Sequence, residues 1–368
     1  LTVAAATPTS AQLLTLPRDG NNEKASVSQW IGLVEVNITY NAPQVTAPDG
    51  TDRTGKIWGQ LVPYGMANLG FGTCGEGCPW RAGANENTVF RVSHDVKVEG
   101  QPLPAGSYGL HAIPGPEEWT LIFSRNSTSW GSFSYNAAED ALRVKVKPVK
   151  AEYTHWLTYE FTVRKPDRAT AVLRWENLQV PWTITVENID ELYIESIRRQ
   201  LRGAPGFTWQ AWEQAARFCL DKKLNLKEGL DWARTAVAAQ FIGQENFRTL
   251  RTLADLQAAN GLTAESEQTM EKALAHPTAG VLDLHQYGRL LLGRGDKEKA
   301  LKVFELNAKR FGDTWPVHVG LARGASAVGR LPEARTHAKQ ALAQAPDDVN
   351  KQNLQKMVED LGAGKPAK

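Results

Sequence analysis

The chain has 368 residues, more than one hydrophobic core usually serves, so two domains are expected. Hydrophobic residues make up 42% of the sequence and charged residues 22%, a balance that argues against intrinsic disorder and against a fibrous repeat. The 42 Lys and Arg residues oppose 40 Asp and Glu, and a formal charge of +2 argues against nucleic acid or an anionic membrane as the main partner. No run of about 18 apolar residues occurs, so no membrane span is predicted.

Residues 1–26 are predicted to be the remnant of a secretory signal or a flexible arm. Residues 1–12 are mostly small and apolar and contain a small-x-small triplet, which is typical of the cleavage region of a signal peptide. This interpretation predicts a protein that is periplasmic or otherwise exported. The alternative is a flexible arm rich in Ala, Thr and Pro, which would indicate nothing about the cellular location of the protein.

Residues 27–188 are predicted to form an antiparallel β domain. Apolar residues alternate with polar ones along its segments, which indicates strands with one face in contact with water. Turn-forming Gly, Pro, Asn and Asp separate the segments, and no helical pattern lies between them, so an all-β antiparallel sandwich or flattened barrel is expected. The predicted strands are 34–40, 88–92, 119–123, 142–146, 156–163, 170–175 and 182–186.

The chain has three cysteines, and two of them are predicted to form a local disulfide. Cys74 and Cys78 are separated by Gly, Glu and Gly, which allow the backbone to turn tightly, and an exported protein meets an oxidising compartment. A redox-active pair is the alternative. A c-type haem site is excluded, because three residues separate the cysteines and Pro79 follows them. Cys219 is expected to be a buried apolar residue of a helix.

Four blocks of the β half form a recognisable pattern. The blocks are residues 55–65, residues 80–88, residues 103–109, and residues 118–123 with 130–133. Together they resemble a bacterial family of unknown function, domain of unknown function 2911. The resemblance covers roughly residues 27–187 and implies export and an all-β fold, but no activity. The chain departs from the family pattern by an insertion at residues 67–79, which holds the cysteine pair.

One of these blocks is the predicted ligand-binding site, formed by Trp80, Arg81, Asn85 and Glu86. Indole faces stack on the apolar faces of sugars, while guanidinium groups donate hydrogen bonds to small polar ligands and amide groups donate or accept them. The alternative is purely structural: an ion pair between Arg81 and Glu86 and a turn at Asn85 would join strands at the edge of the sandwich.

Beyond the β domain, the hydrophobic period changes from two to 3.6. Residues 189–206 are predicted to be a connecting helix and linker, residues 207–362 a tetratricopeptide-like helical solenoid, and residues 363–368 a flexible tail. Gly261, Gly295 and Gly329 follow one another at intervals of 34 residues, the tetratricopeptide period. Five residues after each glycine comes a small residue, Ser266, Ala300 or Ala334. A diverged unit at residues 209–240 brings the number of repeats to about four.

The sequence contains no recognisable catalytic or metal-binding motif. No His-Glu-x-x-His helix, Gly-x-Ser-x-Gly elbow or zinc-type spacing of Cys and His occurs, so no metal, cofactor or catalytic residue is predicted. The remaining alternative pairs His94 with His111 across the sheet as a metal or acid/base pair.

The sequence therefore predicts an exported, non-enzymatic interaction protein. Stacked hairpins share a core and leave a groove, and the repeats are expected to dock on a protein partner. One form of this prediction is an accessory subunit on the periplasmic face of a membrane assembly. Two alternatives are a carbohydrate- or small-ligand-binding β domain with a helical spacer, and an uncharacterised hydrolase.

Overall fold

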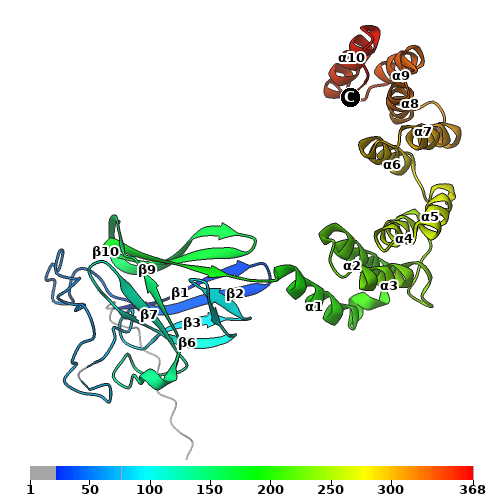
Figure 1. The fold of residues 1–368 in the computed structure, drawn as a ribbon. Helices are drawn as coiled ribbons and strands as arrows, with labels where there is room; N and C mark the ends of the chain where they lie inside the picture. The colour runs from blue at the N-terminus through cyan, green and yellow to red at the C-terminus, as the bar shows by residue number, and fades with distance from the viewer. Residues whose placement is uncertain (1–21, 76, 368) are drawn as a thin grey trace, which may run out of the picture. The chain divides into compact units, whose positions relative to one another are not determined.

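A computed structural model describes residues 22–75 and 77–367, and the chain divides into two compact units between Tyr193 and Ile194 (Figure 1). Most of the predicted signal remnant, residues 1–21, lies outside the described residues. The first unit is built from strands and the second from helices, so the predicted fold class is confirmed.

The strands of the first unit form two antiparallel sheets rather than a closed barrel. Both sheets contribute to one hydrophobic cluster, as expected for a sandwich. The six-stranded sheet has the order β1 (Glu23–Ile31), β2 (Val34–Ala42), β3 (Thr88–Val92), β6 (Gly106–Ile113), β7 (Trp119–Ser124) and β8 (Asp140–Val146). The four-stranded sheet has the order β5 (Gln101–Leu103), β4 (Val96–Val98), β10 (Arg168–Thr185) and β9 (Val149–Lys165).

The register of the six-stranded sheet places apolar side chains on the inner face. Ile38 of β2 lies opposite Phe90 of β3, which in turn lies opposite Tyr108 of β6, and all three are buried. Residues two positions along each strand continue this face, because successive side chains of a strand alternate between faces. The hydrophobic period of two thus accounts for the core.

The β domain begins four residues earlier than predicted, with the strand β1, which was not among the predicted strands, so the expectation of an arm reaching residue 26 is wrong for residues 23–26. Glu23 pairs with Ala42, and the register then continues without a break. The outer face carries polar contacts: the hydroxyls of Ser26 and Thr39 lie 3.1 Å apart, and the amide nitrogen of Asn37 donates to Ser26 at 2.9 Å. Polar strand residues give no hydrophobic signal, which explains the misplaced boundary.

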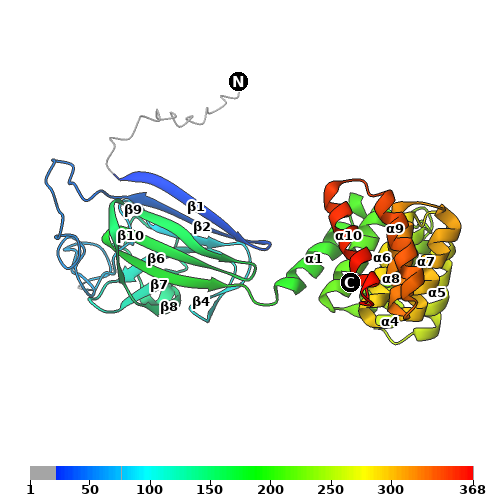
Figure 2. The same cartoon turned by 90° about the horizontal axis from the view of Figure 1, so that it is seen from above.

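The segments 170–175 and 182–186, predicted as separate strands, belong to the single strand β10, which runs beside β9 (Figure 2). A β-bulge joins them. Glu176 has a φ of 54°, and the pairing with β9 shifts on both sides of it. The buried residues change from odd positions such as Trp175 to even positions such as Trp182. The bulge also buries the carboxylate of Glu176, which accepts a hydrogen bond from the backbone N–H of Gly55.

The helices of the second unit form antiparallel pairs, which follow one another in chain order from green to red in Figure 1. The predicted tetratricopeptide-like arrangement is confirmed. After α1 (Ile189–Leu201) and the 3-10 turn η2 (Ala204–Phe207), the pairs are α2 (Trp209–Lys222) with α3 (Leu226–Ala238), α4 (Phe247–Ala259) with α5 (Thr263–Ala275), α6 (Val281–Arg294) with α7 (Lys297–Phe311), and α8 (Trp315–Ala327) with α9 (Leu331–Ala343), followed by α10 (Asp348–Gly362).

Glycine and other small residues fix the geometry of these pairs. Gly295 ends α6 with a φ of 88°, a conformation that residues with a Cβ rarely adopt, and Gly261 and Gly329 have similar values. Ala300, five residues later, is fully buried. The glycines therefore repeat every 34 residues because each turn between paired helices needs the same backbone conformation.

The chain end after α10 lies against the helices, which corrects the prediction of a flexible tail for residues 363–367. Gly364 has a φ of 75°, and the backbone N–H of Ala367 donates to Ser326 Oγ of α8 at 2.7 Å. Ala367 also packs against the apolar cluster of α8, α9 and α10.

Candidate binding sites

The β unit contains a cleft of about 400 Å³ beside the loops that precede β3. Its lining combines cations, amides and indoles, and no Asp or Glu from the described part of the chain contributes to it. The polar and aromatic residues of the lining are Asn22, Arg53, Trp80, Arg81, Asn85 and Trp175.

Two of these residues belong to a cluster of tryptophans. The rings of Trp80 and Trp175 are nearly parallel, with an interplanar angle of 13° and centroids 6.4 Å apart, and Trp58 meets both edge to face. Trp175 is 1% exposed, and its indole nitrogen has no hydrogen-bond partner among the described residues. Because the bulge at Glu176 follows directly, the position of this indole depends on an irregularity of β10.

Arg81 is held in place on three sides. Its guanidinium donates to the backbone carbonyl of Asn85 at 2.8 Å and lies 4.8 Å above the centre of the Phe133 ring. A Cβ at Gly131 would come within 2.6 Å of the guanidinium, so only glycine fits there. Burial lowers the pKa of Arg81, although an arginine with this shift remains charged at neutral pH.

The structure brings three of the four predicted ligand-binding residues to one cleft. Trp80, Arg81 and Asn85 line it, whereas Glu86 does not and instead accepts a 2.7 Å hydrogen bond from the side chain of Asn41. Ligand binding by these residues stays a prediction.

Two lining residues were not predicted as part of the site. Arg53 comes from the loop after β2 and was not predicted to belong to any site, and Trp175 was predicted only as part of a strand. Neither is near Trp80 in the sequence, so no local pattern could have joined them.

The disulfide between Cys74 and Cys78 is present, with 5.3 Å between the two Cα atoms. Cys78 exchanges two backbone hydrogen bonds of 2.9 Å with Ala67, and the backbone N–H of Thr73 donates to the carbonyl of Phe133 at 2.7 Å. The loop is thereby fixed next to the cleft, which Cys78 also lines. The third cysteine, Cys219, is buried between helices as predicted.

His94 and His111 do not meet, so their proposed pairing is wrong. His111 of β6 lies beside the start of β3, whereas His94 follows the end of β3, and this five-residue strand measures about 13 Å between its ends. His111 is buried, and its Nδ1 lies 2.9 Å from Ser132 Oγ. Burial and then the charge of Arg81 lower the pKa of His111 to about 4. No group of three or more potential metal ligands occurs in the part of the chain that the structure describes.

The second candidate surface follows the first helix of each pair. The first helices of the four pairs can be aligned by counting back from the small residue at the equivalent position of each second helix. These reference residues are Gly229, Ser266, Ala300 and Ala334. The residues 15 positions earlier are Gln214, Arg251, His285 and Val319, and those 11 positions earlier are Phe218, Asp255, Arg289 and Arg323. We call these eight positions the first-helix face.

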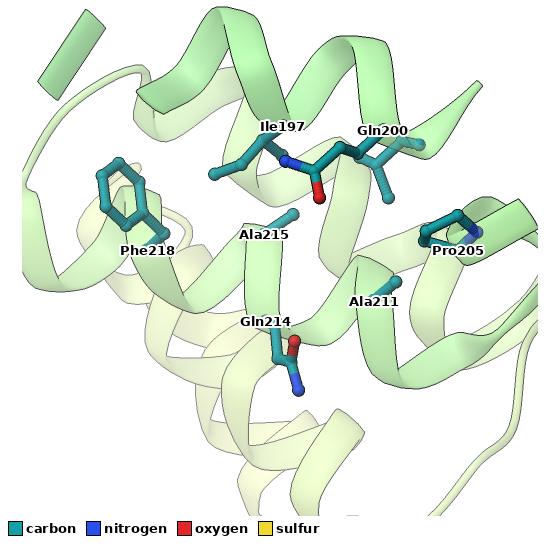
Figure 3. Close-up of a pocket in the computed structure, with 8 residues that line it drawn as sticks. Ile197, Gln200, Pro205, Ala211, Gln214, Ala215 and Phe218 are labelled. Atoms are coloured by element: carbon teal, nitrogen blue, oxygen red, sulfur yellow. The ribbon is translucent and has the colours of Figure 1, made fainter. Parts of the chain in front are cut away.

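At its α2 end, the first-helix face borders an apolar pocket of about 290 Å³ between α1 and α2. Figure 3 shows Ile197 and Gln200 of α1 facing Ala211 and Ala215 of α2, with Phe218 at one end. Leu201 and Pro205 complete the apolar wall. The pocket has the size and chemistry to accept an apolar side chain.

Charges between α2 and α4 are compensated. Glu213 is fully buried, accepts hydrogen bonds from Thr252 at 2.8 Å and from Arg217 at 3.2 Å, and forms an ion pair with Arg248. Burial raises the pKa of Glu213, but these contacts outweigh burial, and the pKa is lowered overall. The single buried carboxylate of Glu213 is thus the counterion of both Arg217 and Arg248.

Charges between α6 and α8 are not compensated. Arg289 and Arg323 form no ion pair with a carboxylate among the described residues, and the Nε atom of Arg323 is buried without a partner. Burial, and then the nearby charge of Arg289, lower the pKa of Arg323. Burial and the charges of both arginines lower the pKa of His285 to about 4, against a small opposing effect of the Pro316 carbonyl. At neutral pH this end of the face carries two unopposed cations.

None of the helices in the described ranges has the length and hydropathy of a membrane span.

Residues 22–184 match the model of the family described as "Protein of unknown function (DUF2911)", which confirms the resemblance of the β half. No curated protein matches the chain.

Among solved structures, the chain is similar to MamA (residue 41 to the end) from Desulfovibrio magneticus RS-1, with 15% identity over 44% of this chain and 92% of that chain and a TM-score of 0.30. It is similar to the TPR-like repeats of a putative kinesin light chain from Podosopora anserina, with 17% identity over 42% and 85% and a TM-score of 0.31. A tetratricopeptide repeat protein from Parabacteroides merdae matches with 16% identity over 46% and 68% and a TM-score of 0.32.

Proposed function

We propose that this chain is a non-enzymatic interaction protein whose first-helix face binds an acidic segment of a partner protein. The observation that carries the proposal is the pair of cations, Arg289 and Arg323, without a counterion among the described residues. Arg323 is partly buried, so its charge without a counterion costs free energy, whereas Arg289 is exposed. Carboxylates from a partner would remove the cost at Arg323 and would form charge-assisted hydrogen bonds with both guanidinium groups. Tetratricopeptide-like repeats themselves suggest protein–protein interaction.

The position of the apolar pocket between α1 and α2 supports the proposal that the bound partner segment is extended. It lies next to Phe218, the α2 member of the first-helix face, whereas the cations lie on α6 and α8. Between the pocket and these cations, Arg251 Nε and Asp255 Oδ2 of α4 lie 3.8 Å apart, so their opposite charges offset each other. We therefore propose a segment that places an apolar side chain in the pocket and its acidic residues against Arg289 and Arg323.

The test is recovery of the partner from the source organism, using the full chain and cross-linking. The variant R289E/R323E should lower the recovery of the main partner about tenfold or more, because two charge-assisted contacts become repulsive. The matched control K302E/K309E changes the same charge on α7, a second helix, and should leave recovery unchanged. The cross-linked partner peptide should be rich in Asp and Glu. Equal recovery with both variants, or a basic partner peptide, would overturn the proposal.

We also propose that the chain works outside the cytoplasm, as an accessory subunit on the periplasmic face of a membrane assembly. The bridge between Cys74 and Cys78 supports this proposal, since disulfides persist in oxidising compartments and are rare in the bacterial cytoplasm. Cell fractionation with thiol-blocking reagents should find the native protein bridged and in the periplasmic fraction. A reduced protein in the cytoplasmic fraction would contradict export.

A further inference from the structure

The cleft of the β unit is large enough for a small organic ligand. Its volume of about 400 Å³ falls within the usual range for ligand sites, which begins near 300 Å³. It lies within the first unit and shares no residue with the first-helix face, so its occupancy is a separate question from partner binding.

The cations in this cleft are held by neutral groups. Arg53 donates to the backbone carbonyls of Val45 at 3.1 Å and Gln44 at 2.8 Å, just as Arg81 donates to the carbonyl of Asn85. Neither guanidinium forms an ion pair with a carboxylate in the described ranges, and no described carboxylate lines the cleft. Hydrogen bonds within its own turn, and to a smaller extent the charge of Arg53, lower the pKa of Asp49, but Asp49 is exposed and lies outside the lining. Backbone carbonyls fix the position of a guanidinium without neutralising it, so two oriented positive charges remain for an anion.

The cleft also offers a hydrogen-bond donor to an uncharged part of a ligand. Trp175 lines the cleft, but its indole nitrogen is itself buried, so this residue contributes ring surface and not a donor. The side-chain oxygen of Asn85 accepts from Asn22 at 3.4 Å, and the amide nitrogen of Asn85 has no partner among the described residues. A hydroxyl group would satisfy this donor.

The remaining surface is apolar and partly aromatic. Trp80 is part-buried and lines the cleft together with Pro79 and Leu69. Indole rings pack against flat apolar surfaces, including the C–H faces of pyranose rings. A purely aromatic acid would leave the amide donor of Asn85 unpaired, and inorganic phosphate would leave the apolar wall uncovered.

We propose that this cleft binds an acidic sugar: a carbohydrate of one or two rings whose carboxylate pairs with Arg53 and Arg81. A ring hydroxyl accepts from the amide of Asn85, and the apolar ring face lies against Trp80. The left-handed backbone at Asn85, with a φ of 56°, presents the amide beside Arg81.

The proposal is tested by calorimetric titration of the full chain with glucuronate, galacturonate and the disaccharide of each. At least one of these probes should bind more tightly than glucose, galactose, benzoate and phosphate. R53Q should weaken binding about tenfold or more, because it removes a charge-assisted contact. N85G keeps the left-handed backbone accessible and removes only the amide, and it should weaken binding several-fold.

Two controls separate binding from folding. W130A removes an indole that is 58% exposed and does not line the cleft, and R91Q removes a cation from a surface ion pair; neither should change the affinity. Thermal unfolding of each variant verifies that it is folded. If no acidic sugar binds the wild-type chain more tightly than the neutral sugars, or if benzoate or phosphate binds at least as well, the proposal is overturned. Unchanged affinity in folded R53Q and N85G would overturn it as well.

Discussion

The α2–α4 and α6–α8 ends of the helical unit treat positive charge in opposite ways. Between α2 and α4, Arg217 and Arg248 share the buried carboxylate of Glu213, whereas between α6 and α8, Arg289 and Arg323 face each other without one. The same 34-residue architecture carries both arrangements. The difference shows that the repeat specifies where a charged side chain lies, while the choice of residue decides whether its charge stabilises the fold or is left for a ligand.

The largest expected effect comes from removing the compensating carboxylate. E213Q leaves Arg217 and Arg248 without their shared counterion, so the free energy of unfolding should fall by about 3 kcal/mol. Urea unfolding monitored by circular dichroism measures this. The matched variant E271Q, at an exposed position of α5, should change the free energy by less than about 0.5 kcal/mol. Equal effects of the two variants would show that the α2–α4 end is not held by this charge pair.

The next effect is a pH dependence at the opposite end. The pKa of His285 is about 4 in the folded chain and near 6.5 when unfolded, so the unfolded state binds more protons between these values. Stability is therefore expected to fall as the pH drops from 7 to 5, by about 1–2 kcal/mol for this residue. H285Q should remove that part of the slope, while His111, whose pKa is also about 4, maintains the rest. A slope unchanged in H285Q would mean that His285 is not buried as described.

The smallest effect should have the opposite sign to the first. R323M replaces a half-buried, uncompensated cation by an apolar side chain of similar length, so the free energy of unfolding should stay the same or rise by up to about 1 kcal/mol. Thermal unfolding of the wild type and of R323M measures the difference. A loss of more than about 1 kcal/mol would show that Arg323 is paired in the free protein, and the contrast between the two ends would disappear.

What the sequence predicted follows from local requirements. The turn glycines, such as Gly295, recur at 34 residues because the turn needs a positive φ, and the strand alternation follows from one buried face. Trp80, Arg81 and Asn85 were found together because one loop carries all three. Each of these features depends on residues that lie close together in the sequence.

What the sequence did not predict depends on distant contacts. Arg53 and Trp175 reach the cleft from separate parts of the chain, and nothing in the composition around Glu176 indicates a bulge that changes which residues of β10 face inward. Likewise, the carboxylate of Glu213 on α2 accepts a hydrogen bond from Thr252 on α4. No repeat pattern in the sequence distinguishes this buried carboxylate from one that is exposed to solvent. Charge compensation in the repeats could therefore be recognised only in three dimensions.

The ring of Phe304 on α7 has a further consequence. It fills the space left by Gly288 of α6, where an added Cβ would overlap the ring, and by Gly324 of α8, where the gap would be 2.8 Å. These glycines are the immediate neighbours of Arg289 and Arg323. The thickness of one core side chain therefore limits how closely these parts of α6 and α8 approach, and a smaller residue at position 304 is expected to shift Arg289 and Arg323 relative to each other.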